Sequence, residues 1–115
     1  MKKVLTLALV IFVLQLRLYA SCSSPLPKKM FETELIKIKA HDFDEAKKIA
    51  IEILLEKCLT SIQVKQLLKE LNFEEDKLDI AKKAFSKISD PENYGVIKTV
   101  FDFEESKKVI DGLSN

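Results

Sequence analysis

The sequence predicts an all-α fold of five or six short antiparallel helices, arranged as helix–turn–helix repeats of about 30 residues. The first observation is that the 115-residue chain has only two Gly and three Pro, which favours helices with short connections over many short strands. The second is a recurring pattern of phenylalanine, two acidic residues and a lysine, which starts at Phe43, Phe73 and Phe103. A repeat of this length suits a pair of helices.

Each of these three phenylalanines marks the start of a predicted helix. Acidic side chains in a first helical turn face the positive end of the helix dipole. A hydrophobic residue just before that turn can fold back onto the helix as a staple. The pattern therefore predicts helices over residues 43–57, 73–87 and 103–112. We also expect the phenylalanines to be bulky anchors that a neighbouring helix buries.

The second helix of each repeat has its own start signal. Thr60 and Gln63 form a capping box, in which Thr60 is the N-cap and Gln63 reaches back to it. Thirty residues later, Asp90 can cap a helix whose first position is Pro91. These signals predict helices over residues 60–71 and 90–101.

A further helix is expected before the repeats. Phe31, Leu35 and Ile38 follow helical spacing, which predicts a helix over residues 30–40. Residues 35–39 also alternate between apolar and polar, so a strand is the competing interpretation. The apolar positions that the repeat brings together should form one continuous core: Phe43, Ala50, Leu54, Cys58, Val64, Leu67, Leu71, Phe73, Ile80, Ala84, Ile88, Tyr94, Ile97, Phe101 and Ile110.

The N-terminus has the pattern of a secretory signal peptide. A basic start is followed by an apolar run over residues 4–16 and then by a small residue suited to cleavage. The run is shorter than the roughly 20 residues that span a bilayer. We therefore expect a signal peptide over residues 1–21, a flexible linker over 22–29 and the helical domain over 30–115. The protein would be exported, and so secreted, periplasmic or envelope-associated.

The charge of the mature chain argues against nucleic acid as a partner. Removal of the signal peptide takes away Lys2, Lys3 and Arg17, which leaves 16 basic and 18 acidic residues and a formal charge of −2. Binding to phosphate groups needs a clustered basic field, whereas this composition is evenly mixed and faintly acidic.

Cys22 has three alternative fates. Its position after small residues resembles the lipidation site of a bacterial lipoprotein, which would make it a membrane tether. It can instead remain free, or form a disulfide with Cys58, which export permits. A flexible linker argues against the disulfide, since a bridge needs a fixed pair of Cα atoms. Cys58 aligns with Ile88 in the repeat, so we expect a small buried hydrophobe there.

No catalytic residue, cofactor or metal site is predicted. His41 is the single histidine and lies in a predicted connection, without a visible nucleophile to form a triad. The acidic residues at 74–79 lack the glycine turn and ligand spacing of a calcium loop.

Asp90, Asn93 and Tyr94 form the most distinctive polar and aromatic group. They can be a small interaction patch, because tyrosine offers an apolar body with a polar tip. The structural interpretation, which the repeat alignment favours, is a helix cap followed by a tyrosine at the edge of the core.

Three stretches carry a resemblance to a known family: CLTSIQVKQLL from Cys58, FEEDKLDIAKKAF from Phe73 and SDPENY from Ser89. They resemble the family catalogued as domain of unknown function 4476, over about residues 30–113. The resemblance implies a small α-helical domain, usually in exported proteins and often from Bacteroidota. It implies no activity, cofactor or catalytic residue.

These features favour an exported helical module that binds an unknown protein or peptide and has no catalysis of its own, because stacked helix pairs leave extended surfaces. The alternative function is a small carrier of apolar ligands, which needs a cavity between helices of a few hundred cubic ångströms. An enzyme is the third hypothesis, and the absence of a catalytic constellation in the sequence counts against it.

Overall fold

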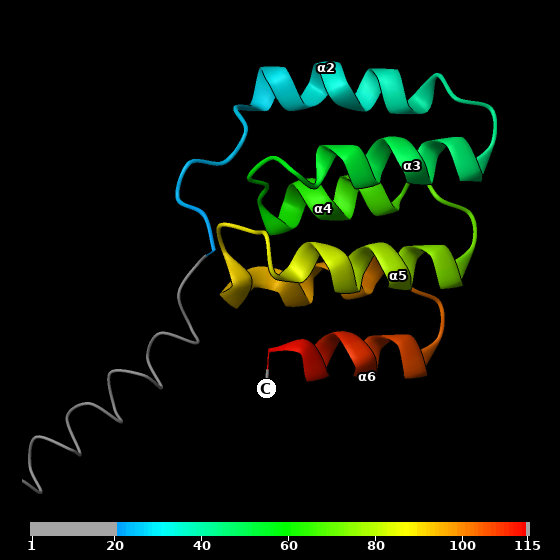
Figure 1. Cartoon of the computed structure of the whole chain (residues 1–115). Coiled ribbons are helices and arrows are strands. Elements are labelled where there is room, and N and C mark those ends of the chain that lie inside the picture. The colour runs from blue at the N-terminus through cyan, green and yellow to red at the C-terminus, as the bar shows by residue number, and fades with distance from the viewer. Residues whose placement is uncertain (1–20, 115) are drawn as a thin grey trace, which may run out of the picture.

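A computed structural model describes residues 21–114 and contains, over that range, helices and no strands, which confirms the all-α fold (Figure 1). The predicted signal peptide falls on residues that lie almost entirely outside this range. Within the range, no helix has the length and apolar character needed to cross a membrane. The elements in chain order are α2 (Lys28–Lys39), α3 (Asp44–Leu54), α4 (Ser61–Leu68), α5 (Glu74–Phe85), the 3-10 helix η1 (Pro91–Val100) and α6 (Glu104–Leu113).

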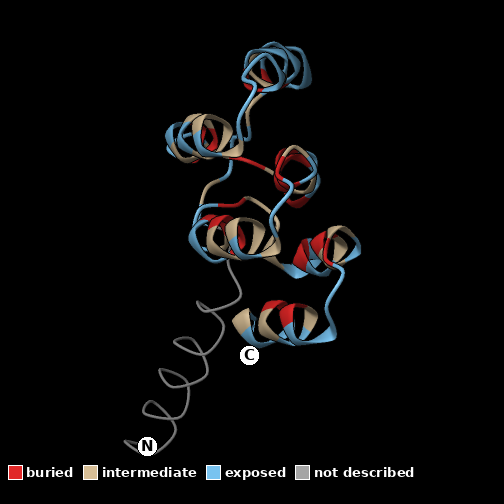
Figure 2. Cartoon of the chain, turned by 90° about the vertical axis from the view of Figure 1, so that its right-hand side faces the viewer, coloured by how far each residue is buried: buried red, intermediate tan, exposed pale blue. Residues whose placement is uncertain are grey.

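The helices alternate in direction, so that the chain crosses the molecule once with each element. In Figure 1, α3, α5 and α6 all begin at the right-hand edge, and α2, α4 and η1 all begin at the left. α3 packs on α5, and α5 on α6, while α4 packs most extensively on η1. Figure 2 shows the buried side of each helix turned towards the interior of this stack. The repeat therefore places equivalent helix starts along one edge.

The segments that were predicted to be helical are helical, and the first of them settles the competing interpretation. Residues 28–39 form a helix rather than a strand, with Phe31 and Ile38 buried. α3 ends at Leu54, about one turn earlier than predicted, since the chain must turn there before it enters α4. The segment after Pro91 is a 3-10 helix rather than an α-helix.

The core agrees with the prediction at most positions. Of the predicted core residues, those with buried side chains are Leu54, Val64, Leu67, Leu71, Ile80, Ala84, Ile88, Tyr94, Ile97, Phe101 and Ile110. Ala50 and Cys58 are half-buried. The expectation for the phenylalanines was wrong, because Phe43 is 75% exposed and Phe73 is 64% exposed. Each has extended backbone angles at the N-cap of its helix, where the side chain lies beyond the region that the neighbouring helices cover.

The segment that was expected to be a flexible linker lies against the domain. Cys22 forms a disulfide with Cys58, with 5.9 Å between their Cα atoms. Leu26 N donates to Cys58 O at 2.8 Å, and Gln63 Nε2 donates to Leu26 O at 2.8 Å. These two bonds, one between backbone atoms and one from a side chain, hold the segment close enough for the bridge. Cys58 is therefore a disulfide partner and not the buried hydrophobe that we expected.

An ion-pair network joins α3 to α5 and gives the acidic residues of α5 a structural role. Lys48 Nζ lies 2.9 Å from Asp79 Oδ2 and 3.4 Å from Asp76 Oδ1. Lys83 Nζ lies 3.0 Å from the same Asp79 oxygen and 3.2 Å from Glu52 Oε2. The hydrogen bonds from Lys48 and then from Lys83 lower the pKa of Asp79, although burial opposes them.

This network predicts a small loss of stability in acid. A carboxyl whose pKa is lowered by folding contributes stability above its ordinary value of 3.8, and that contribution disappears as the pH falls through the folded pKa. Because the side chains of Asp79 and Lys48 are both partly exposed, water screens their attraction, and the loss of stability should be less than about 1 kcal/mol. The free energy of unfolding of Asp79→Asn should fall below that of the unchanged protein at about pH 7 and approach it at about pH 2. A difference that is equal at both pH values would contradict this role.

Candidate functional site

The predicted capping box at the start of α4 is confirmed. Gln63 N donates to Thr60 Oγ1 at 3.1 Å, and Thr60 N donates to Gln63 Oε1 at 3.0 Å. The Gln63 side chain also donates to Leu26 O, so one residue serves both the helix start and the docked N-terminal segment. Thr60 and Gln63 are therefore structural residues.

Asp90, Asn93 and Tyr94 do not form an exposed patch. The Tyr94 side chain is buried at 2% exposure, and its hydroxyl donates to Ala81 O at 2.5 Å. Burial raises the pKa of the Tyr94 phenol above its ordinary value. The ring packs against Phe85 with 5.2 Å between centroids. A side chain held in this way cannot contact a partner, so Tyr94 belongs to the core.

Asp90 is a cap, but not of the helix that follows it. No side-chain bond from Asp90 caps η1. Its Oδ1 instead accepts from Ser61 N at 2.7 Å, and Ser61 Oγ lies 3.0 Å from both Asp90 Oδ1 and Asp90 O. The Asp90 carboxylate thus accepts a hydrogen bond from the first backbone N–H of α4, which is the equivalent helix of the previous repeat. Asn93 Nδ2 supports it with a bond of 3.2 Å to Asp90 Oδ2.

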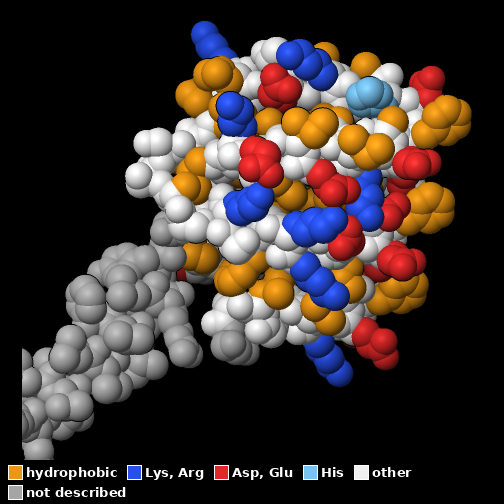
Figure 3. Space-filling view, in the orientation of Figure 1, with side chains coloured by type: hydrophobic (Ala, Val, Ile, Leu, Met, Phe, Trp, Pro, Cys, Tyr) orange, Lys and Arg blue, Asp and Glu red, His pale blue; other side chains and the backbone are white. Residues whose placement is uncertain are grey.

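The most prominent exposed apolar feature is a column of three phenylalanines, which we call the phenylalanine ladder: Phe43, Phe73 and Phe103. Their exposed fractions are 75%, 64% and 62%. They are the N-cap residues of α3, α5 and α6, whose starts share one edge of the molecule (Figure 1). In Figure 3, hydrophobic and acidic side chains alternate down that right-hand edge.

The acidic residue after each of the first two phenylalanines fixes the backbone of the next one. Asp44 Oδ2 accepts from Asn72 N at 2.6 Å and from Phe73 N at 3.3 Å. Glu74 Oε1 accepts from Asp102 N at 3.0 Å and from Phe103 N at 3.1 Å. Burial raises the pKa of Glu74, but these backbone bonds outweigh it and the net pKa is lowered. The three aromatic side chains are therefore presented by a backbone that is tied together from one repeat to the next.

The ladder edge carries carboxylates that make no ion pair with a lysine among the described residues. Glu45, Glu75 and Glu105 follow the three phenylalanines at the same repeat position, and all three are exposed. Within residues 21–114, they and the exposed Asp42 and Asp102 make no ion pair. The nearby lysines are partly occupied: for example, Lys77 Nζ donates to Val100 O at 3.0 Å and Lys107 pairs with Glu104. The edge is thus apolar and acidic.

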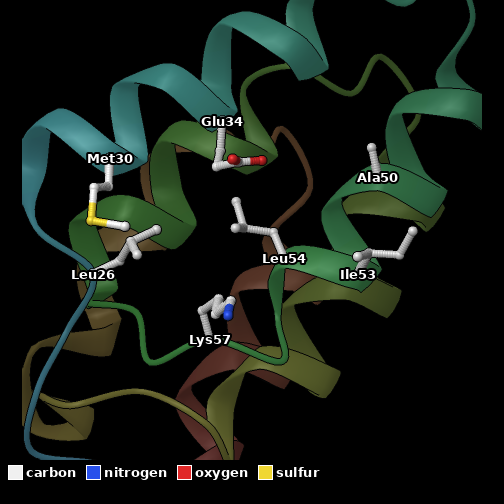
Figure 4. Close-up of a pocket in the computed structure, with 7 residues that line it drawn as sticks. All are labelled: Leu26, Met30, Glu34, Ala50, Ile53, Leu54 and Lys57. Atoms are coloured by element: carbon white, nitrogen blue, oxygen red, sulfur yellow. The ribbon is translucent and has the colours of Figure 1, made fainter.

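A second feature is a groove between α2 and α3 (Figure 4). Its volume is about 200 Å³, and its lining is mainly apolar: Leu26, Met30, Glu34, Ala50, Ile53, Leu54 and Lys57. Pockets for small ligands usually measure about 300–1,000 Å³. A larger hollow of about 420 Å³, bordered by Lys48, Asp79 and Lys82, is polar because it lies over the ion-pair network.

The remaining candidates for chemistry are dispersed. His41 is exposed in the connection between α2 and α3. Over the part of the chain that the structure describes, no three His, Cys, Asp or Glu side chains are grouped so that they could hold a metal ion.

Sequence reasoning found the phenylalanines of the ladder but misplaced their side chains. The signal that could have corrected it is their position directly before acidic first turns. A residue there is the N-cap, and an N-cap lies at the end of a helix rather than along its packed face.

Comparison with known proteins supports the family and nothing finer. The family model described as a domain of unknown function, DUF4476, matches residues 27–113. Searches of the curated proteins and of the solved structures found no match. The matched range includes every helix that the structure describes, from Lys28 at the start of α2 to Leu113 at the end of α6. The chain therefore belongs to the DUF4476 family.

Proposed function

We propose that this protein is an exported, non-catalytic module that binds a protein or peptide partner through the phenylalanine ladder. The observation that carries the proposal is the exposure of three large aromatic side chains at one position of a repeat. Burial of each in an interface would contribute about 1.5–3 kcal/mol from the hydrophobic effect. In the free protein these rings contribute little to the fold.

The fixed backbone of the ladder also favours binding. Association loses free energy when loops and side chains must be ordered at the interface. The bonds from Asp44 to Phe73 and from Glu74 to Phe103 set the ladder backbone before any partner arrives. Aromatic residues on a rigid scaffold are typical of protein-binding surfaces.

Two features support export. The first is the signal-peptide pattern of the N-terminus. The second is the Cys22–Cys58 disulfide, because such bridges persist in oxidising compartments outside the cytoplasm. Lipidation would use the same Cys22 sulfur as the bridge, so the two are mutually exclusive. Our proposal is the bridged form, in a secreted, periplasmic or envelope-associated protein.

The second candidate function is a carrier of small apolar ligands, and the groove between α2 and α3 favours it. Met30 and Ile53 line this groove and are 57% and 68% exposed. Its volume of about 200 Å³ is suited to a small molecule at most. The ladder is the stronger candidate, since three equivalent positions expose the same residue type.

The ladder predicts a large loss of partner binding without a loss of folding. A photoreactive amino acid at position 73, in the native host, would identify the partner by mass spectrometry. The purified partner should then bind the variant Phe43→Ser/Phe73→Ser/Phe103→Ser at least about 100-fold more weakly, as expected for the loss of several hot-spot aromatics. The free energy of unfolding should change by less than about 1 kcal/mol, because the rings are exposed.

The matched control is Ile62→Ser, which removes an exposed apolar side chain at the start of α4, at the opposite edge of the molecule from the ladder. It should leave partner binding unchanged. Equal weakening by both variants would mean that general surface hydrophobicity, and not the ladder, holds the partner. If only the variant Ile53→Ser loses partner binding, the groove between α2 and α3 is the binding surface instead.

A further inference from the structure

We propose that the phenylalanine ladder binds an extended, basic segment of its partner, in which an apolar side chain recurs at every third residue. This inference rests on the proposed function and names the chemistry of the partner. It is carried by the unpaired carboxylates beside the ladder and by the spacing of the helices that present it.

Charge complementarity selects a basic partner. Glu45, Glu75 and Glu105 recur beside the three rings and make no ion pair within residues 21–114. Lysine or arginine in a partner would neutralise them and would speed association. The same carboxylates oppose the phosphates of nucleic acid and the headgroups of anionic membranes. Two copies of this chain meeting ladder to ladder would place like charges together.

The spacing selects an extended segment. α3, α5 and α6 are packed neighbours, and packed helices lie about 8–10 Å apart. A polyproline II helix has three residues per turn and rises about 3.1 Å per residue, or roughly 9 Å per turn. Every third side chain of such a segment faces the same way and would meet successive spaces of the ladder. The residues between them can carry the basic side chains that reach the glutamates.

The shape of the surface also favours this conformation. An amphipathic helix needs a continuous hydrophobic groove along its length, whereas polyproline segments dock between aromatic side chains. The ladder is a row of separate exposed rings, Phe43, Phe73 and Phe103. The N-terminal segment of the chain itself is a less suitable occupant. It continues from Ser21, which bonds to Ile88 O beyond the opposite end of α5 from Phe73.

A designed peptide tests the inference directly. The probe is a peptide of about nine residues that repeats the triplet Leu-Pro-Lys, to favour polyproline II. Its binding to the protein purified from the native host, as processed there, is measured by calorimetry at low salt, about 50 mM. We expect binding that is at least about tenfold tighter than that of two controls. One control has the same composition with its leucines adjacent, and the other has Glu in place of Lys.

Protein variants test the same surface from the other side. The variant Glu45→Gln/Glu75→Gln/Glu105→Gln should weaken binding of the Leu-Pro-Lys peptide by at least about tenfold. The matched control Glu32→Gln/Glu92→Gln changes exposed carboxylates that lie away from the ladder and that make no ion pair within residues 21–114. It should leave binding unchanged.

Several outcomes would overturn the inference. If the Leu-Pro-Lys peptide does not bind, or if either control peptide binds equally well, the partner is not an extended, basic segment. Tighter binding of an α-helical peptide with the same charge, ladder-dependent binding to phospholipid vesicles, or a ladder-dependent dimer in sedimentation would identify a different occupant. If the natural partner still depends on the ladder when the peptides fail, the proposed function stands and only the partner class is lost. If neither depends on the ladder, both proposals fail.

Discussion

Replacement of Cys22 and Cys58 together by serine is expected to lower the free energy of unfolding by about 3–4 kcal/mol. The bridge joins residues 36 positions apart, so its loss releases a long loop in the unfolded chain. The backbone bond from Leu26 to Cys58 and the bond from Gln63 to Leu26 remain possible, but each contributes only about 1 kcal/mol. We therefore expect the segment before α2 to detach more readily as well.

Urea unfolding measures the loss of stability, and hydrogen exchange measures how readily the segment before α2 detaches. The unchanged protein under reducing conditions is the control and should match the double variant. In the native host, the intact protein should be lighter by two hydrogens than its reduced form. A mass with added acyl chains on Cys22 would show that its sulfur carries lipid. Equal stability of the double variant and the oxidised protein would contradict the structural role of the bridge.

The substitution Asp90→Ala is expected to cost about 2–4 kcal/mol, although Asp90 lies in a short connection. Its carboxylate accepts from Ser61 N at 2.7 Å and from Ser61 Oγ, which lies 3.0 Å away. Ser61 is fully buried, so water cannot replace the lost acceptor. Each buried polar group left without a partner costs about 1–3 kcal/mol. Ser61 Oγ also donates to the backbone oxygen of residue 90, and this bond remains in the variant, so the expected cost is smaller than the sum of two unpaired groups.

The substitution Asp90→Asn separates the hydrogen bond from the charge. It keeps an oxygen that can accept from Ser61 N, so most of the stability should return in urea unfolding. Asn93→Ala is the matched control, because Asn93 is exposed and supports only Asp90; it should cost less than about 1 kcal/mol. An Asp90→Ala protein that keeps its stability but loses partner binding would restore the interaction patch that the sequence suggested.

Local signals in the sequence predicted where helices begin. The Thr60–Gln63 box, the acidic first turns and Pro91 act within a few residues, so they can be interpreted without knowing the rest of the fold. The apolar positions that the repeat aligned, such as Leu67 and Ile97, are buried for the same reason: helical periodicity places them on one face. The strand alternative for residues 35–39 failed because burial of Phe31 and Ile38 requires the helical period.

The candidate site was only half predictable. The repeat singled out Phe43, Phe73 and Phe103, but whether a side chain at a helix end is covered depends on which segments lie beyond that end. The structure places none there among the described residues, and the rings are exposed. For Tyr94, the structure confirms the core position that the repeat alignment favoured over an interaction patch, since its ring packs against Phe85 and its hydroxyl bonds to Ala81.

By itself, the sequence determined the all-α class, the repeat, the helix starts and most of the core, because these follow from periodicity and from contacts within a turn. Only the tertiary structure decided the partners of Asp90, Cys22 and Asp44, which lie 29, 36 and 28 residues away along the chain. Contacts of this kind depend on how whole helices stack. That stacking turned a recurring helix-start signal into a ladder of exposed aromatic side chains along one acidic edge.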